Sequence, residues 1–186
     1  MISLPQLWLP IVLSAVFVYV ASSLIHMVVK WHNPDYLSLP NEDEVRAAIR
    51  RMNPAPGQYV LPRITDMGQL KSPDVQKKFV EGPVGFLMLR KSGSPNMLPS
   101  LVQWFFYSLL VSLFAAYLSS RTLSLGTHYL KVFRVTGTVA FLGYAAGAIP
   151  QAIWMGKPWR SALKEIADGL IYGLLTAGAF GWLWPR

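Results

Sequence analysis

The sequence predicts an all-α integral membrane protein, a four-transmembrane-helix bundle with a small α+β extramembrane segment between helices 1 and 2. Apolar residues make up 53% of its 186 residues and charged residues only 14%, roughly half the charged share of an ordinary soluble domain. The charges are also clustered, because 17 of the 26 Asp, Glu, Lys and Arg residues fall between Lys30 and Lys91. The rest of the chain is therefore too bare of charge to cover a water-exposed surface.

Four stretches are long enough to cross a bilayer, which takes about 20 mostly apolar residues in a helix. They are residues 7–29, 98–119, 132–154 and 162–184. The first has no charged side chain, whereas the fourth carries Glu165 and Asp168 in its first turns. The predicted organisation is thus a first helix within residues 1–29, an extramembrane segment at 30–97 and three further helices within 98–186.

The first apolar stretch is interpreted as a retained helix and not as a cleaved signal peptide. Residues 1–10 contain no Lys or Arg, whereas a signal peptide opens with a positively charged region. The apolar run also continues beyond its only cluster of small residues, at positions 21–23, as far as Val29.

The tryptophans support these boundaries, because Trp favours the interface between lipid and water, where its ring and its N–H are both satisfied. Every tryptophan lies within about two turns of a predicted span end. The seven are Trp8, Trp31, Trp104, Trp154, Trp159, Trp182 and Trp184.

The distribution of basic residues near the span ends predicts the orientation. Six lie on the side of residues 30–97 and of the short turn at 156–161, against four on the other side. Because Lys and Arg collect in cytoplasmic loops, we expect residues 30–97 in the cytoplasm and both termini outside. The small size of the chain favours a bacterial inner membrane.

The segment at residues 30–97 has the signals of a helix–strand–helix–strand mini-domain. Asn41 precedes an acidic first turn, and Ser72-Pro73 is a second helix start. Residues 58–61 and 84–90 are expected as two strands that pair. A single pair of strands is marginal alone in water, so we expect this segment to rest on the membrane surface or on a partner.

The net charge of +8 is interpreted as membrane-related, because no basic helix or nucleic-acid-binding motif accompanies it. The expected partner is the lipid bilayer, joined by a second copy of the chain or by another membrane protein, and no nucleic acid is expected. The absence of cysteine excludes disulfides and thiolate metal sites.

Small residues recur every four positions in the fourth span, which places them on one helix face where a neighbouring helix can approach closely. The third span has a shorter pattern of the same kind. Docking of these two spans on each other is the predicted use, with a helix of another chain as the alternative. The helix-packing residues are Gly143, Gly147, Gly169, Gly173, Ala177 and Gly181.

Polar side chains also recur near mid-span, where lipid offers no hydrogen-bond partner. They are Tyr19, Ser112, Tyr144 and Tyr172. Two hypotheses follow: these residues form hydrogen bonds that hold the bundle together, or they line a polar pocket or permeation path. No ionisable residue occurs at that depth, which argues against a proton relay.

Asp168 is the candidate functional acid, because an ionisable residue inside the hydrocarbon edge is functional by default. Pairing with Lys164 or Arg160 is the alternative. The histidines predict no site: His26 and His32 follow the first span, whereas His128 lies on the opposite side. No catalytic, cofactor-binding or metal-ligating residue is therefore assigned from the sequence, and no cofactor is expected.

Three functions are compatible with these observations. The first is a non-catalytic accessory, assembly or sensing subunit that acts through helix packing. The second is an oligomeric small-solute transporter or channel, which the mid-span tyrosines motivate. The third is a membrane-embedded enzyme acting on lipid, for which Asp168, Glu165 and the histidines near the interface are the acid–base groups. The sequence favours the first, and leaves enzymatic activity open with a lean against it.

Overall fold

The computed structural model describes residues 2–186, and the chain divides into two compact units. Unit 1 consists of Met1–Tyr36, Asn96–Ala152 and Lys157–Arg186. Unit 2 consists of Leu37–Pro95 together with Ile153–Gly156. Each unit is described by itself.

Unit 1 is helical. Its helices are α1 (Trp8–Ser23), α4 (Leu98–Thr122), α5 (Tyr129–Ala145), α6 (Ala148–Trp154) and α7 (Trp159–Trp182). A 3-10 turn at Leu4–Leu7 precedes α1, and a π-helical turn at Leu24–Val29 extends it.

Three helical segments are long and apolar enough to cross a membrane, namely Leu4–Val29, Leu98–Thr122 and Tyr129–Trp154. They correspond to the first three predicted spans. Helix α7 has 24 residues but carries Lys164, Glu165 and Asp168 in its first turns, which lowers its hydropathy. A fourth span stays a prediction.

The third segment is not one continuous helix, because α5 ends at Ala145 and α6 begins at Ala148. Pro150 explains the break. Proline has no backbone N–H to donate, and its ring crowds the carbonyl group four residues earlier, which here belongs to Ala146. The segment also begins three residues before the predicted position 132, at Tyr129, where the ring of His128 accepts a hydrogen bond from the Leu130 N–H at 3.3 Å.

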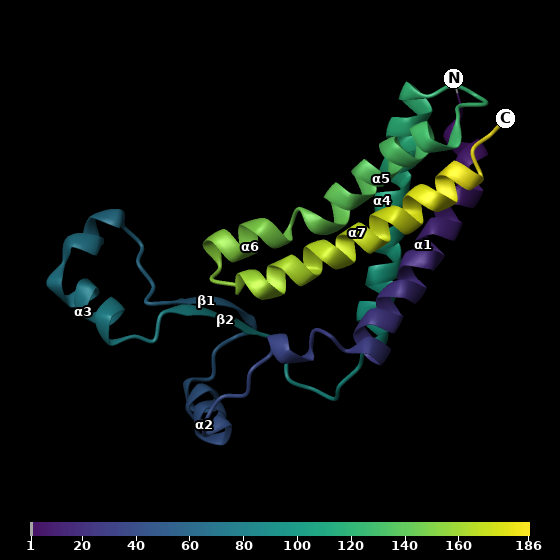
Figure 1. Cartoon of the computed structure of the whole chain (residues 1–186). Coiled ribbons are helices and arrows are strands. Elements are labelled where there is room, and N and C mark those ends of the chain that lie inside the picture. The colour runs from purple at the N-terminus through teal and green to yellow at the C-terminus, as the bar shows by residue number, and fades with distance from the viewer. Residues whose placement is uncertain (1) are drawn as a thin grey trace. The chain divides into compact units, whose positions relative to one another are not determined.

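The long helices form a closed arrangement in which α1 packs on α4 and α7, and α5 packs on the same two helices. Figure 1 shows the N- and C-termini at one end of this bundle, beside the connection between α4 and α5. Leu7, Leu123 and Phe180 are buried together there. The indole N–H of Trp184 donates to the carbonyl of Ser124 at 3.0 Å and fixes the C-terminus to that connection.

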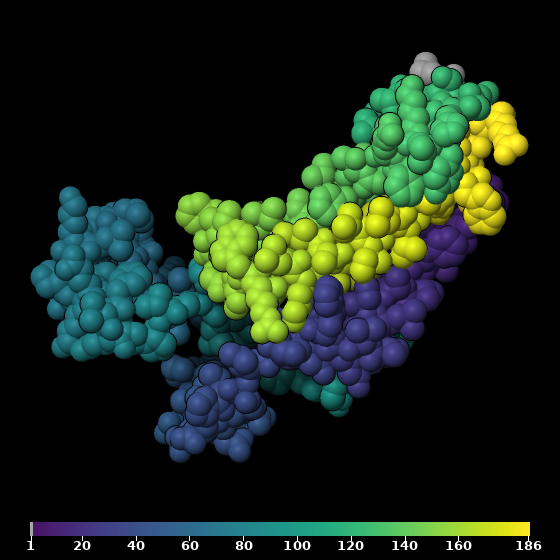
Figure 2. All heavy atoms as spheres, viewed as in Figure 1, coloured from purple at the N-terminus to yellow at the C-terminus, as the bar shows by residue number. Residues whose placement is uncertain are grey.

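Small and hydroxylated side chains fill the interior of the bundle, whereas large apolar side chains cover its outside. The buried polar residues on α1, α4, α5 and α7 include Ser14, Ser108, Ser112, Thr136 and Thr176. Large side chains such as Phe106, Phe114 and Leu163 are more than half exposed. Figure 2 shows α7 filling the surface between α1 and α5, which it contacts. This distribution is consistent with a membrane location, since lipid solvates apolar side chains and small residues let helices approach closely.

The small-residue face of α7 lies against α5. A Cβ atom added at Gly169 would be 2.8 Å from the Cβ atom of Ala145, and one at Gly173 would be 3.2 Å from the Cα atom of Phe141. Both distances are shorter than ordinary contacts, so only glycine fits while the helices keep this separation.

The other predicted packing residues have three different surroundings. Ala177 faces Gly137 of α5, and Gly181 lies on the ring of Tyr129. Gly143 packs instead on Val111 of α4, at 3.1 Å from an added Cβ to its nearest methyl group. Gly147 lies in the break between α5 and α6, where an added Cβ would meet no atom of the described residues within 4 Å. Gly147 therefore makes no close contact with another helix among the described residues, and its part in helix packing stays a prediction.

Unit 2 contains α2 (Glu42–Met52), β1 (Gly57–Leu61), α3 (Pro73–Glu81) and β2 (Gly85–Leu89). The two strands pair antiparallel, with Gly57 opposite Leu89 and Leu61 opposite Gly85, so the predicted small sheet is confirmed. Asn41 precedes α2 in a left-handed conformation (φ 52°), and its side chain makes no capping bond. The structure describes every residue of unit 2, and none of them is buried.

Candidate functional site

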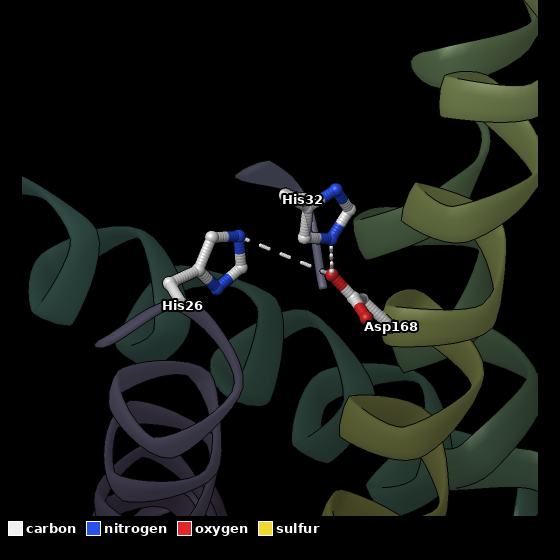
Figure 3. A group of neighbouring side chains, drawn as sticks. All are labelled: His26, His32 and Asp168. Carbon is white, nitrogen blue, oxygen red and sulfur yellow. Dashed lines mark hydrogen bonds and ion pairs between the residues drawn. The ribbon is translucent and has the colours of Figure 1, made fainter. Parts of the chain in front are cut away.

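A cluster that we call the His–Asp centre lies in unit 1 where the extension of α1 ends, and it consists of His26, His32 and Asp168. Figure 3 shows both imidazole rings directed at the same carboxylate. His32 Nε2 is 2.7 Å from Asp168 Oδ2, and His26 Nε2 is 4.0 Å from the same oxygen. The two rings stack with centroids 4.9 Å apart.

Local backbone geometry brings the two histidines together. His26 lies in the π-helical turn at Leu24–Val29, a form of helix that is frequent at functional sites. Lys30 then adopts a left-handed conformation (φ 55°) that ends the helix. A 3-10 turn at Asn33–Asp35 follows, and places His32 and Asp35 beside α7. Asp168 belongs to α7, so the centre joins the start and the end of the chain.

Asp35 and Lys164 support the centre from outside. Asp35 Oδ2 is 3.0 Å from His32 Nδ1, and the Lys164 ammonium donates to Asp35 Oδ1 at 2.7 Å and to the carbonyl of Trp31 at 2.6 Å. The hydrogen bond from Lys164 lowers the pKa of the Asp35 carboxyl, with a smaller contribution from His32. Asp35 is therefore a carboxylate at neutral pH, and it holds the His32 ring in place.

The hydrogen-bond partner of each Nδ1 atom determines whether the Nε2 atom of the same histidine carries a proton or a lone pair. His26 Nδ1 lies 2.9 Å from the carbonyl oxygen of Ser22, and a carbonyl only accepts hydrogen bonds. The proton of a neutral His26 ring is therefore on Nδ1, and its Nε2 directs a lone pair toward Asp168. His32 has a carboxylate oxygen at each ring nitrogen, so forming both hydrogen bonds at once requires a doubly protonated ring.

Asp168 is deeply buried, with 3% of its surface exposed. Its Oδ2 atom faces the two histidines, whereas its Oδ1 atom has no hydrogen-bond partner among residues 2–186. The Tyr172 hydroxyl, one turn further along α7, is also buried without a partner in that part of the chain. Burying a polar atom without a partner is costly, so this part of the centre has unused bonding capacity.

His26 connects the centre to a cavity of about 270 Å³ between the end of the first helical segment and the start of α4. The wall is mainly apolar, with Met27, Met97 and Leu101 contributing to it, and Ser22 and His26 give it polar groups. The indole N–H of Trp104 donates to the Ser22 hydroxyl at 2.8 Å and closes one side. The His26 side chain is half exposed, so it is the member of the centre that a molecule in the cavity can reach.

The structure brings together only two of the four mid-span polar residues. The rings of Tyr144 and Tyr172 are 5.4 Å apart, and both pack on Trp104. Tyr19 packs on Phe105 instead. The Ser112 hydroxyl accepts a hydrogen bond from Ser14 at 2.9 Å. Of these contacts, only the one between Tyr144 and Tyr172 joins two of the four residues, and a permeation path lined by all four stays a prediction.

Sequence reasoning considered Asp168 but not its partners. It offered Lys164 or Arg160 as the pairing residue, whereas in the structure His32 bonds to Asp168 and Lys164 bonds to Asp35. The histidines were expected to form no site, yet two of them lie in this cluster. The sequence does contain a signal for this cluster: His26, His32 and Asp35 lie near the end of the first span, and Asp168 lies in another span. The 136 positions between His32 and Asp168 hid their proximity.

No protein-family model, curated protein or solved structure matches this chain. Only the geometry of the centre therefore bears on the roles of His26, His32 and Asp168. That geometry defines a helical bundle with a buried acid–imidazole centre beside an apolar cavity.

Proposed function

We propose that the chain is a multi-pass membrane protein that crosses the bilayer four times, with α7 as the fourth span. Helix α7 packs along both α1 and α5, which belong to segments of membrane-spanning length. Its C-terminal end is buried with the chain start and with the connection after α4. Its charged first turns do not oppose insertion, because Asp168 is enclosed by protein and Lys164 is paired.

The same proposal places both termini outside and residues 30–97 in the cytoplasm of a bacterial cell, in the inner membrane. The excess of basic residues on that side supports the orientation. The His–Asp centre then lies at the cytoplasmic end of the bundle, near the headgroups, where water reaches the exposed side of His26.

Single cysteines test the fourth span, because the natural chain has none. We expect Ser3→Cys, Thr127→Cys and Arg186→Cys to react with a membrane-impermeant maleimide from one side of the membrane only. Gly93→Cys should react only from the other side. Labelling of Arg186→Cys on the side of Gly93→Cys would mean that α7 does not cross the bilayer.

We propose further that the protein is a membrane-embedded enzyme acting on a lipid or another amphipathic substrate. One observation carries this proposal: His26 belongs both to the buried His–Asp centre and to the wall of the apolar cavity. An apolar chain in the cavity would bring the polar end of the substrate to an imidazole with a free lone pair. The small-residue face of α7 gives little support to an accessory role that acts through helix packing, because α5 already covers Gly169 and Gly173.

The chemical roles follow from the hydrogen bonds. His26 Nε2, whose lone pair faces Asp168, is the proton acceptor for a water molecule or substrate group that approaches this edge of the ring, and the Ser22 carbonyl keeps the His26 proton on Nδ1. Asp168 stabilises the positive charge that His26 gains, from 4.0 Å. His32 holds the Asp168 carboxylate, and Asp35 holds His32, so these two are positioning residues.

The test follows lipids by mass spectrometry after purified protein is incubated with vesicles made from the lipids of its host membrane. We expect conversion of a lipid class by the natural protein, and a rate at least about 100-fold lower in His26→Ala, because a positioned acid or base contributes about 10²–10⁴-fold. His128→Ala is the matched control, since His128 caps α5 away from the centre. Unchanged lipids with the natural protein, or equal rates in both variants, would refute the enzymatic role.

A second candidate, the accessory or assembly subunit, is favoured by unit 2, in which no described residue is buried. Its large apolar residues Leu37 and Val80 are about nine-tenths exposed. Such a unit gains stability by resting on the headgroups or on another membrane protein. Crosslinking in native membranes from cysteines in β1 shows whether unit 2 contacts another protein or only lipid. Adducts with lipid alone would count against a protein partner.

A further inference from the structure

We propose that the His–Asp centre binds one divalent transition-metal ion of the zinc class through His26 Nε2, His32 Nε2 and Asp168 Oδ2. The inference rests on the proposed function and names a cofactor for the same site. With an ion bound, His26 Nε2 would be a ligand and no longer the proton acceptor, and the ion would instead supply the activation of water or substrate. The structure places one ligand atom of each residue within 4.8 Å of the others. The three residues come from two chain segments, which hydrogen bonds from His32 to Asp168 and from Lys164 to Asp35 hold together.

The spacing of the ligand atoms suits a small tetrahedral ion. Zinc bonds of about 2.0–2.1 Å imply ligand atoms about 3.3 Å apart in a tetrahedron. The distances to Asp168 Oδ2, 2.7 Å from His32 Nε2 and 4.0 Å from His26 Nε2, lie on either side of that value. All three ligand atoms lie within 4.8 Å of one another, so binding an ion requires the half-exposed His26 ring to leave its stacked position on His32 and turn toward Asp168.

The outer hydrogen bonds are those of metal-binding histidines, which donate their second ring N–H to a carboxylate or a backbone carbonyl. His26 Nδ1 has the Ser22 carbonyl, and His32 Nδ1 has the Asp35 carboxylate. Both arrangements leave Nε2 as the ligand atom. Lys164 in turn fixes Asp35, so the second shell is built from residues on both segments.

The charges also call for a cation. Asp168 and Asp35 bring two carboxylates to the centre, and the Lys164 ammonium offsets one of them. A metal ion bound at His32 Nε2 would lie between this ring and the Asp168 carboxylate. It also gives the unpartnered Asp168 Oδ1 atom a nearby positive charge.

The donor set identifies the class of ion. Two imidazole nitrogens with one carboxylate oxygen match the three-ligand sites of catalytic zinc, which keep a further position for water or substrate. Calcium and magnesium prefer oxygen ligands throughout. The free position would lie on the exposed side of His26, toward the cavity.

The experiment uses the full chain in detergent, purified with an affinity tag that contains no histidine. Protein stripped with a chelator is equilibrated with micromolar Zn²⁺, and bound metal is measured by plasma mass spectrometry. We expect one zinc per chain, and intense visible absorption when Co²⁺ is bound instead. His26→Ala and Asp168→Asn should lose the metal, and Asp35→Asn should bind it about 10–100-fold more weakly.

His128→Ala is the matched control and should bind zinc like the natural chain. Because His26 is half exposed, His26→Ala should keep the natural elution volume, so its loss of metal is not loss of fold. Absence of bound zinc in the natural chain, or equal binding by His26→Ala and His128→Ala, would overturn the inference. Lipid conversion by fully chelated protein would also overturn the metal as the cofactor, while the enzymatic role would stand. Zinc binding without lipid conversion would support the metal site and refute only the enzymatic role.

Discussion

Asp168→Ala is expected to destabilise the bundle by about 3–5 kcal/mol, as removal of one partner from a buried ion pair commonly does. The carboxylate is buried and holds His32 at 2.7 Å, so its loss leaves the ring of His32 with one unmatched nitrogen in the protein interior. Unfolding in a detergent of graded denaturing strength, with a chelator present, measures this effect apart from any bound metal.

Glu165→Ala is the matched control for that measurement, because it removes the same kind of side chain from the same helix nearly one turn away. Glu165 is substantially more exposed than Asp168 and pairs with Lys157. Pairs of that kind contribute about 1 kcal/mol or less, so the control should stay close to the natural stability. Equal losses in the two variants would show that the buried centre has no special part in holding α7.

Combining Gly169→Ala with Gly173→Ala is expected to push α7 away from α5. The added methyl groups would come within 2.8 Å of Ala145 and 3.1 Å of Phe141 side-chain atoms, and within 3.2 Å of α5 backbone atoms. Overpacking of this kind costs about 1–3 kcal/mol at each site. The same detergent unfolding series measures the loss, and zinc binding should weaken with it because Asp168 precedes Gly169.

Gly147→Ala separates close packing from the general effect of replacing a glycine, because an added methyl group there meets no described atom within 4 Å. We expect it to leave stability unchanged or higher by about 0.4–1 kcal/mol, since Gly147 is not among the residues with positive φ and alanine lowers the conformational entropy of the unfolded chain. A loss as large as that of the combined variant would contradict the packing argument.

Much of the fold could be predicted from local patterns. Three predicted spans are confirmed as segments of membrane-spanning length, since twenty apolar residues in a row are decisive by themselves. The pair of short strands was visible from its flanking Pro and Gly residues. The break before Pro150 could also have been derived, because the lost N–H is a property of that one residue.

The candidate site could not be assembled in this way. His26, His32 and Asp168 are each visible in the sequence, but nothing local states that a π-helical turn and a left-handed Lys30 bring the two rings together. The polar tyrosines show the converse case. Tyr19 and Tyr172 lie at similar depths of their spans, yet helix rotation directs Tyr19 to Phe105 and Tyr172 to Trp104.

The sequence by itself determined which segments are helical and which of them are apolar enough to leave water, because both properties depend on residues near one another in the chain. Only the tertiary structure decided which helix faces meet, and therefore that a histidine at the end of the first helical segment and another just beyond it reach an acid of the last. The reason is physical: periodicity fixes what lies on a helix face, whereas the rotation and partner of that face are set by close packing between distant segments.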